Sequence, residues 1–326
     1  MKKFLVTGGC GFIGSHLAEK LIRLGYEVLI IDNLSTGRLE NIKHFKNKCK
    51  FYKADISNIK QIDKYFKDIN TVFHCAALAD IVPSIQNPKN YYNSNVTGSF
   101  NVISSCIKYK VKKIIYTASS SCYGIAEKTP TKEEEKINPE YPYALTKYLG
   151  EQIILHWSKV YKIKSISLRL FNVYGPRSRT SGTYGAMFGI FLAQKIFSKP
   201  YTVVGNGEQT RDFTYISDIV EVLIKASKSN LTQEIFNIGS GRTVSVNYIV
   251  KLLKGKKVKI PKRPGEPEIT FASISKVKKK LKWKPKIKIE KGIKLLLKNL
   301  DYWKSAPVWT PKKIAIATKD WFKYLK

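Results

Sequence analysis

Acidic residues and arginines are both scarce in this chain. Its 326 residues include 24 Asp and Glu against 58 Lys and Arg, for a formal net charge of +34. Only eight of the basic residues are arginine, which binds phosphates and base edges through two parallel hydrogen bonds. The excess is therefore mainly lysine and favours a basic surface over specific nucleic-acid recognition. It is also uneven, because residues 251–326 contain 23 lysines and one arginine against five acidic residues.

Paired cysteines and long apolar runs are missing as well. The five cysteines form no C-x-x-C pair, and neither they nor the four histidines have metal-ligand spacing, so we expect no metal site and no disulfide framework. Nor does the sequence contain 18 uninterrupted apolar residues, and the apolar run at 4–6 is too short for a signal peptide. We therefore expect a cytoplasmic protein. A hydrophobic content of 43% is enough for a real core.

Strand and helix patterns alternate along the first half of the chain, which is typical of a doubly wound parallel sheet. Expected strands lie at 4–6, 28–31, 49–53, 71–74, 113–117 and 165–170, and expected helices at 58–67, 90–109 and 143–160. The predicted fold class is α/β, with a Rossmann sheet and a smaller C-terminal α/β lobe. We expect an NAD-binding domain at 1–172 with a return segment near 211–239, a substrate lobe at 173–304, and a basic, aromatic extension at 305–326.

A glycine-rich turn joins the first expected strand to the first helix. Gly8 can make the tight turn, Gly11 lets the backbone approach a pyrophosphate, and Gly14 allows close packing of helix and strand. Asp32 ends the next strand, where a carboxylate can bind an adenosine ribose and would repel a 2′-phosphate. The pattern favours NAD, although the nearby Arg38 leaves NADP as an alternative cofactor. A glycine-rich turn that binds no ligand is the alternative interpretation of the whole motif.

Tyr143 and Lys147 lie four residues apart and would share one face of a helix. A nearby ammonium stabilises phenolate, so Tyr143 is a candidate general base. An ordinary exposed pair is the alternative reading of this spacing. Ser119 favours the catalytic one, because it follows a buried strand at the carboxyl edge of the sheet, where ligands of such folds bind.

Taken together, these motifs and several others occur in the order found in a known family. The chain resembles the extended short-chain dehydrogenase/reductases, most of all the nucleotide-sugar 4-epimerases of the UDP-glucose and UDP-N-acetylglucosamine type, over about residues 3 to 300. The motifs are TGGCGFIG at 7–14, DNL at 32–34, HCAA at 74–77, NVTG at 95–98, SSSCYG at 119–124, YALTK at 143–147, RLFNVYGPR at 169–177, GEQTRDF at 207–213 and RPGE at 263–266.

The resemblance implies a role for each matching residue. It implies Ser119, Tyr143 and Lys147 as catalytic residues, with Tyr143 as the base and Ser119 orienting the sugar 4′-hydroxyl. The residues implied in NAD binding are Gly8, Gly11, Phe12, Ile13, Asp32, Asn33, Asp55, Ile56, Ala76, Ala77, Asn95, Tyr143 and Lys147. The residues implied in substrate binding are Ser84, Ser119, Ser121, Asn172, Arg211, Arg263, Glu266 and Thr270. Among these, Arg211 and Arg263 would bind the diphosphate and Glu266 the nucleoside ribose.

The implied reaction is a redox-neutral inversion at C4 of a UDP-sugar through a 4-keto intermediate. Ser120 and Ser121 stand where the related 4,6-dehydratases have Asp and Glu, which argues against dehydration. Thr270 aligns with a position that lines the sugar pocket and is small, so we expect N-acetylated as well as plain hexoses. A UDP-glucuronate 4-epimerase, or another NAD-dependent nucleotide-sugar epimerase or dehydratase, is the alternative.

Partners follow from two further regions. The helices expected at 90–109 and 143–160 resemble those that form a four-helix dimer interface in this family. The extension is expected to dock on its own protein, because Ile314, Ala317, Trp321 and Leu325 form only a narrow apolar stripe. Peripheral membrane association is the less favoured alternative.

A non-catalytic NAD-binding regulator with a nucleic-acid-binding tail is the alternative of another class, and the shortage of arginine argues against it.

Overall fold

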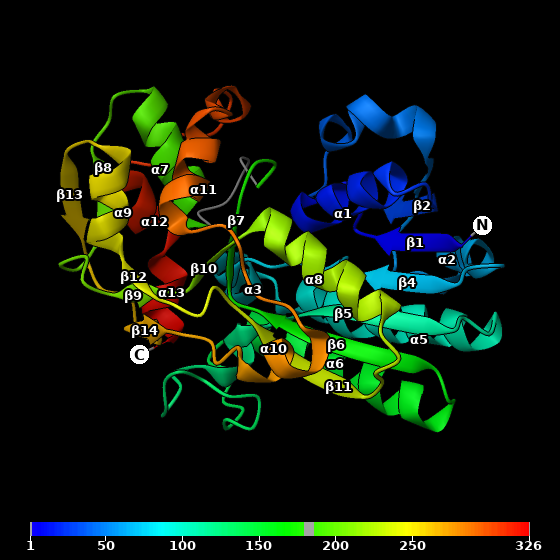
Figure 1. The fold of residues 1–326 in the computed structure, drawn as a ribbon. Coiled ribbons are helices and arrows are strands. Elements are labelled where there is room, and N and C mark those ends of the chain that lie inside the picture. The colour runs from blue at the N-terminus through cyan, green and yellow to red at the C-terminus, as the bar shows by residue number, and fades with distance from the viewer. Residues whose placement is uncertain (1, 179–185, 326) are drawn as a thin grey trace.

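A seven-stranded parallel sheet forms the centre of the larger part of the molecule (Figure 1). The computed structural model describes residues 2–178 and 186–325. In the described residues the strand order is β11-β6-β5-β4-β1-β2-β3. The strand bounds are β1 Lys3–Thr7, β2 Glu27–Asp32, β3 Lys50–Lys53, β4 Thr71–His74, β5 Lys113–Ser119, β6 Lys164–Leu170 and β11 Glu234–Ile238. The predicted α/β fold class with a doubly wound parallel sheet is confirmed.

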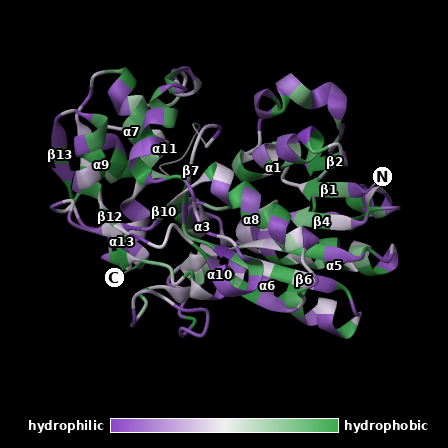
Figure 2. Cartoon of the chain, viewed as in Figure 1, coloured by the Kyte–Doolittle hydropathy of each residue, from purple (hydrophilic) through white to green (hydrophobic). Residues whose placement is uncertain are grey.

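Helices cover both faces of this sheet. Successive strand residues point to opposite faces, and both sets are apolar, so each face is buried against helices. Val6 and Ile30 face a core that includes α1 (Phe12–Arg23) and α8 (Ile216–Lys228). Leu5 and Ile31 face a second core that includes α5 (Gly98–Lys108) and α6 (Pro142–Val160). Much of the central sheet is hydrophobic, and many of the outer loops are hydrophilic (Figure 2). Shorter helices on this part of the chain are α2 (Ile59–Ile62), α3 (Ile81–Gln86) and α4 (Pro88–Tyr92).

A smaller lobe follows β6 and is built from short strands and helices. Its strands are β7 (Asn172–Tyr174), β8 (Tyr201–Val204), β9 (Thr210–Arg211), β10 (Phe213–Tyr215), β12 (Val244–Ser245), β13 (Lys257–Ile260) and β14 (Ile269–Thr270). They pair as β10-β7, β13-β8 and β12-β9-β14. The further helices of this lobe are α7 (Met187–Ile196), α9 (Val246–Leu253) and α11 (Ile289–Leu297), whereas α10 (Ser275–Leu281) packs against β11 and α8 of the larger part. Strand β11 leaves this region and joins the large sheet beside β6. The domain boundaries expected from the sequence stay predictions.

The C-terminal extension folds back onto the protein as two short helices, α12 (Pro311–Ala317) and α13 (Lys319–Tyr324). Ile314 and Trp321, one in each helix, are both buried. The arrangement is therefore the docked one that the narrow apolar stripe predicted. Among the described residues, no helix is both long and apolar enough to span a membrane.

Candidate active site

A cavity of about 620 Å³ extends from the carboxyl ends of β1 and β2 into the smaller lobe. Most of the residues predicted to bind cofactor or substrate line it. Those that do are Gly8, Gly11, Phe12, Ile13, Asp32, Asn33, Ile56, Ala76, Ala77, Ser121, Tyr143, Asn172, Arg211, Arg263 and Glu266. Six others do not line this cavity in the described structure: Asp55, Ser84, Asn95, Ser119, Lys147 and Thr270. Several of these six residues form hydrogen bonds with residues that do line the cavity.

The glycine-rich turn makes a tight cradle at one end of the cavity. Gly8 has a positive φ of 70°, and a Cβ built on it would lie 2.7 Å from the backbone of Ala76. A Cβ on Gly14 would lie 2.2 Å from the Gly8 carbonyl oxygen. The turn leads into α1, whose first N–H groups have no partner within the helix and suit a phosphate. The cradle therefore fits the pyrophosphate of a dinucleotide.

Asp32 lies at the end of β2 and faces the same end of the cavity. Its carboxylate accepts hydrogen bonds from the backbone N–H groups of Cys10, at 2.9 Å, and Leu34, at 2.8 Å. Burial raises the pKa of Asp32, and these two bonds act against that rise. Arg38 was the residue that left NADP as an alternative cofactor, and its guanidinium lies 4.6 Å from the centre of the Tyr302 ring.

Asn33 and Asp55 are joined beside this carboxylate. The Asn33 amide donates to Asp55 at 2.8 Å, and Ser57 donates to the other Asp55 oxygen through its backbone N–H and its hydroxyl. Burial tends to raise the pKa of Asp55, but the bonds from Asn33 and Ser57 outweigh it and lower the pKa. Asp55 thus holds Asn33 and the 55–57 turn in place, and its neighbour Ile56 lines the cavity.

Asn95 and Ser84 lie behind the cavity wall. The buried Asn95 side chain accepts from the Leu78 backbone N–H at 2.9 Å and donates to the Leu78 carbonyl at 3.0 Å. The Ser84 hydroxyl is buried and donates to the Ile81 carbonyl at 2.6 Å. These bonds support the segments that carry Leu78 and Ile81, both of which line the cavity.

Tyr143 and Ser119 meet beside the cavity. The Tyr143 hydroxyl donates to the Ser119 Oγ at 3.1 Å, and Ser119 donates to the Ser121 Oγ at 2.9 Å. Ser119 ends β5, and Tyr143 lies in the first turn of α6. Burial raises the pKa of Tyr143, while the hydrogen bonds with Ser119 and Ser121 act in the opposite direction.

Lys147 lies one turn further along α6 and is only 4% exposed. Its ammonium is 4.3 Å from the centre of the Tyr116 ring on β5, so Lys147 and Tyr143 both face that strand. Burial lowers the pKa of Lys147 to about 8, although the negative charge of Glu151 acts to raise it. The structure thus brings Ser119, Tyr143 and Lys147 to one place, with two titratable groups whose pKa values burial has shifted.

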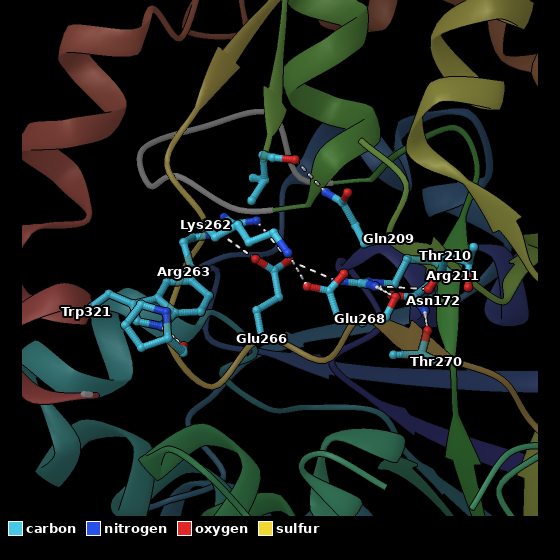
Figure 3. Close-up of polar contacts among 12 residues, drawn as sticks. Asn172, Gln209, Thr210, Arg211, Lys262, Arg263, Glu266, Glu268, Thr270 and Trp321 are labelled. Carbon is cyan, nitrogen blue, oxygen red and sulfur yellow. Dashed lines mark hydrogen bonds and ion pairs between the residues drawn. The ribbon is translucent and has the colours of Figure 1, made fainter. Parts of the chain in front are cut away.

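Charged side chains gather at the other end of the cavity (Figure 3). Glu266 accepts from Arg211 at 3.1 Å and from Arg263 at 2.7 and 2.9 Å. Two guanidinium groups therefore share one carboxylate, which leaves a positive charge suited to a diphosphate. Nearby, the Asn172 amide donates to the Thr270 hydroxyl at 2.9 Å, so Thr270 lies directly behind a residue of the cavity wall.

Several cavity residues were not among those predicted. Tyr141 stacks on Tyr143 with ring centroids 6.2 Å apart and planes 9° from parallel. Its place two residues before Tyr143 was an available signal. Tyr302, Trp309 and Trp321 also line the cavity, but they come from the C-terminal end of the chain, where no local motif marks them.

The fold and this site define a class of protein, and comparison with known proteins identifies it. Residues 4–239 match the NAD dependent epimerase/dehydratase family, so the chain belongs to that family. This confirms the resemblance predicted from the motifs, the assignment as an enzyme and the prediction of NAD as cofactor.

Individual relatives agree with this placement. The chain is 38% identical to a putative UDP-glucose 4-epimerase of Methanocaldococcus jannaschii, over 89% of this chain and 95% of that one. It is similar to the crystal structure of Thermotoga maritima UDP-glucose 4-epimerase with UDP-glucose, with a TM-score of 0.86, 35% identity, and coverage of 93% and 99%. The Bacillus cereus UDP-glucuronic acid 4-epimerase, solved with UDP-glucuronic acid and NAD, matches with a TM-score of 0.84, 32% identity, and coverage of 93% and 99%.

Proposed function

We propose that this protein inverts the C4 configuration of a UDP-sugar, using NAD that is regenerated in each cycle. The observation that carries the proposal is the 3.1 Å hydrogen bond between Tyr143 and Ser119, beside a cavity that holds the glycine cradle at one end and the Arg211 and Arg263 pair at the other. Relatives that are named UDP-glucose and UDP-glucuronate 4-epimerases support the same reaction.

Each residue has a distinct task in this proposal. Bound NAD supplies the acceptor and donor of a hydride. Tyr143 takes the proton of the sugar 4-hydroxyl, and Ser119 orients that hydroxyl through its own Oγ. Lys147 is assigned the task of favouring the phenolate form of Tyr143 through its positive charge, against the burial that raises the pKa of Tyr143. Arg211 and Arg263 hold the diphosphate.

The decisive experiment is turnover of a substrate panel followed by NMR. NAD-loaded protein is incubated with UDP-glucose, UDP-N-acetylglucosamine and UDP-glucuronate, and we expect the first two to be epimerised. Conversion of UDP-glucuronate alone would identify the protein as a UDP-glucuronate 4-epimerase, the alternative, and would contradict our expectation for the other two sugars. No conversion of any of them would refute the reaction and favour the non-catalytic regulator.

Substitution of the base gives the matched test. Tyr143→Phe should lower kcat by about 10²- to 10⁴-fold, the usual contribution of a positioned acid or base. Tyr161, at the end of the same helix, is 54% exposed, and Tyr161→Phe should leave kcat unchanged. Full activity in Tyr143→Phe would contradict the assignment.

We also propose that the protein is a homodimer through α5 and α6, the helices predicted to form a four-helix interface. Phe100 on α5 and Leu145 on α6 are 41% and 44% exposed, and Tyr92, the last residue of α4, is 52% exposed. Apolar residues exposed on adjacent helices support a self-complementary contact. Sedimentation analysis should give twice the 37.2 kDa chain mass. A cytoplasmic location stays a prediction.

A further inference from the structure

The C-terminal extension contributes to the wall of the substrate cavity. Ala306, Pro307, Trp309 and Trp321 of this segment line it together with Arg263. The extension is held where it is by contacts with both parts of the molecule. Helix α13 packs on α3, with Gln86 donating to Asp320 at 2.8 Å, and the Trp309 carbonyl accepts from Gln194 on α7 at 2.8 Å.

Trp321 makes two contacts with the loop that carries Arg263 (Figure 3). The Arg263 guanidinium carbon lies 4.9 Å from the centre of the Trp321 ring. The indole N–H donates to the Pro264 carbonyl at 2.8 Å. Trp321 is only 4% exposed, so its ring is a fixed wall against which the arginine rests.

An aromatic face positions a cation in a way that a carboxylate does not. A free arginine side chain carries about 2 kcal/mol of rotamer entropy, which it must lose when it binds a ligand. Stacking on the indole restricts Arg263 in advance and is worth about 0.5–2 kcal/mol. It does so without adding a second negative charge to the one that Glu266 already places beside Arg263.

We propose that Trp321 is a positioning residue for Arg263, so that the C-terminal extension completes the diphosphate-binding end of the substrate site. The inference rests on the proposed function, because it takes Arg263 to bind the diphosphate of a UDP-sugar. Trp321 acts through the arginine and the Pro264 backbone.

The test compares substitutions that keep or remove the aromatic face. Trp321→Leu keeps an apolar side chain in the buried position, whereas Trp321→Phe keeps a ring under the guanidinium. Calorimetric titration of the NAD-loaded full chain with UDP should give a Kd about 2- to 30-fold higher for Trp321→Leu and close to that of the wild type for Trp321→Phe. Tyr324 lies on the same helix, is 60% exposed, and provides the control Tyr324→Ala.

Two readouts separate positioning from a general structural role. Trp321→Leu should raise the KM of the UDP-sugar by a factor similar to its effect on Kd and leave kcat nearly unchanged, because the diphosphate is held alike in ground and transition states. In an Arg263→Ala background, the same substitution should weaken UDP binding no further.

The outcomes are distinct. Wild-type UDP affinity in Trp321→Leu overturns the proposal, and so does an equal loss of affinity with and without Arg263. If the wild-type protein binds UDP but turns over no UDP-sugar, the proposed reaction fails and the assignment of Trp321 stands. If it does not bind UDP at all, both fail.

Discussion

Lys147 should make the NAD-free protein less stable than an uncharged residue would. Its ammonium is buried against the Tyr116 ring, and burial lowers its pKa from 10.5 to about 8 despite the opposing charge of Glu151. Lys147→Met keeps the length of the side chain and removes the charge. We therefore expect the variant to gain stability while it loses catalytic activity.

The sign and size of the gain follow from proton linkage. Below pH 8, Lys147 is charged in both the folded and the unfolded state, and burying that charge costs about 3 kcal/mol, at about 1.4 kcal/mol for each tenfold change in proton affinity. Between pH 8 and 10.5 the unfolded state binds more protons, so the stability of the wild type rises with pH. At pH 10 the cost has fallen to about 1 kcal/mol.

The assay is urea unfolding of NAD-free wild type and Lys147→Met at pH 7 and pH 10. The variant should be more stable by about 3 kcal/mol at pH 7 and by about 1 kcal/mol at pH 10, because titrating groups that do not interact with Lys147 cancel in the difference. Lys159, exposed on the same helix, provides the control Lys159→Met, which should show no such pH dependence. A difference for Lys147→Met that is the same at both pH values would refute the reasoning.

Two further predictions concern backbone and core. Gly8→Ala should weaken NAD binding at least tenfold, because the new Cβ would lie 2.7 Å from the Ala76 backbone. Titration with NAD measures the change. The control is Gly25→Ala, which is also at positive φ but has open space around it and should leave NAD affinity unchanged. Glu151→Gln should lower the free energy of unfolding in urea by about 3–5 kcal/mol. In the wild type the buried Arg169 lies 2.7 Å from the Glu151 carboxylate, and the substitution leaves this arginine without a countercharge. A loss under 1 kcal/mol would contradict the prediction.

The large sheet could be predicted because its signals are local. Strands β1, β2, β4 and β5 each contain a short apolar run, β6 alternates apolar and polar residues, and the expected helix at 143–160 corresponds closely to α6. The smaller lobe gave no such signal. Its three-stranded sheet is built from β9, β12 and β14, each two residues long and paired across long stretches of chain. Two residues show no periodicity, so such strands arise only from tertiary packing.

The site was predictable to the extent that a motif fixes the direction of a side chain. Tyr143 and Ser119 were predicted as partners, since a helix face and a strand end fix where both lie. Asn95 belongs to an equally clear motif, yet its amide turns to the Leu78 backbone. Trp321 could not be predicted, because its role depends on the return of the C-terminal extension to Arg263.

The scarcity of arginine and the abundance of lysine reflect different uses of positive charge. Each arginine that the structure describes meets a carboxylate or an aromatic ring at close range. The pairs are Arg23 and Arg177 with Glu19, Arg38 with Tyr302, Arg169 with Glu151, Arg211 and Arg263 with Glu266, and Arg242 with Glu290. A planar guanidinium suits such fixed contacts, whereas exposed lysines mainly set the field around the protein. Residues 251–326 illustrate the division, because their 23 lysines accompany a single arginine, Arg263, and that arginine lies in the substrate cavity.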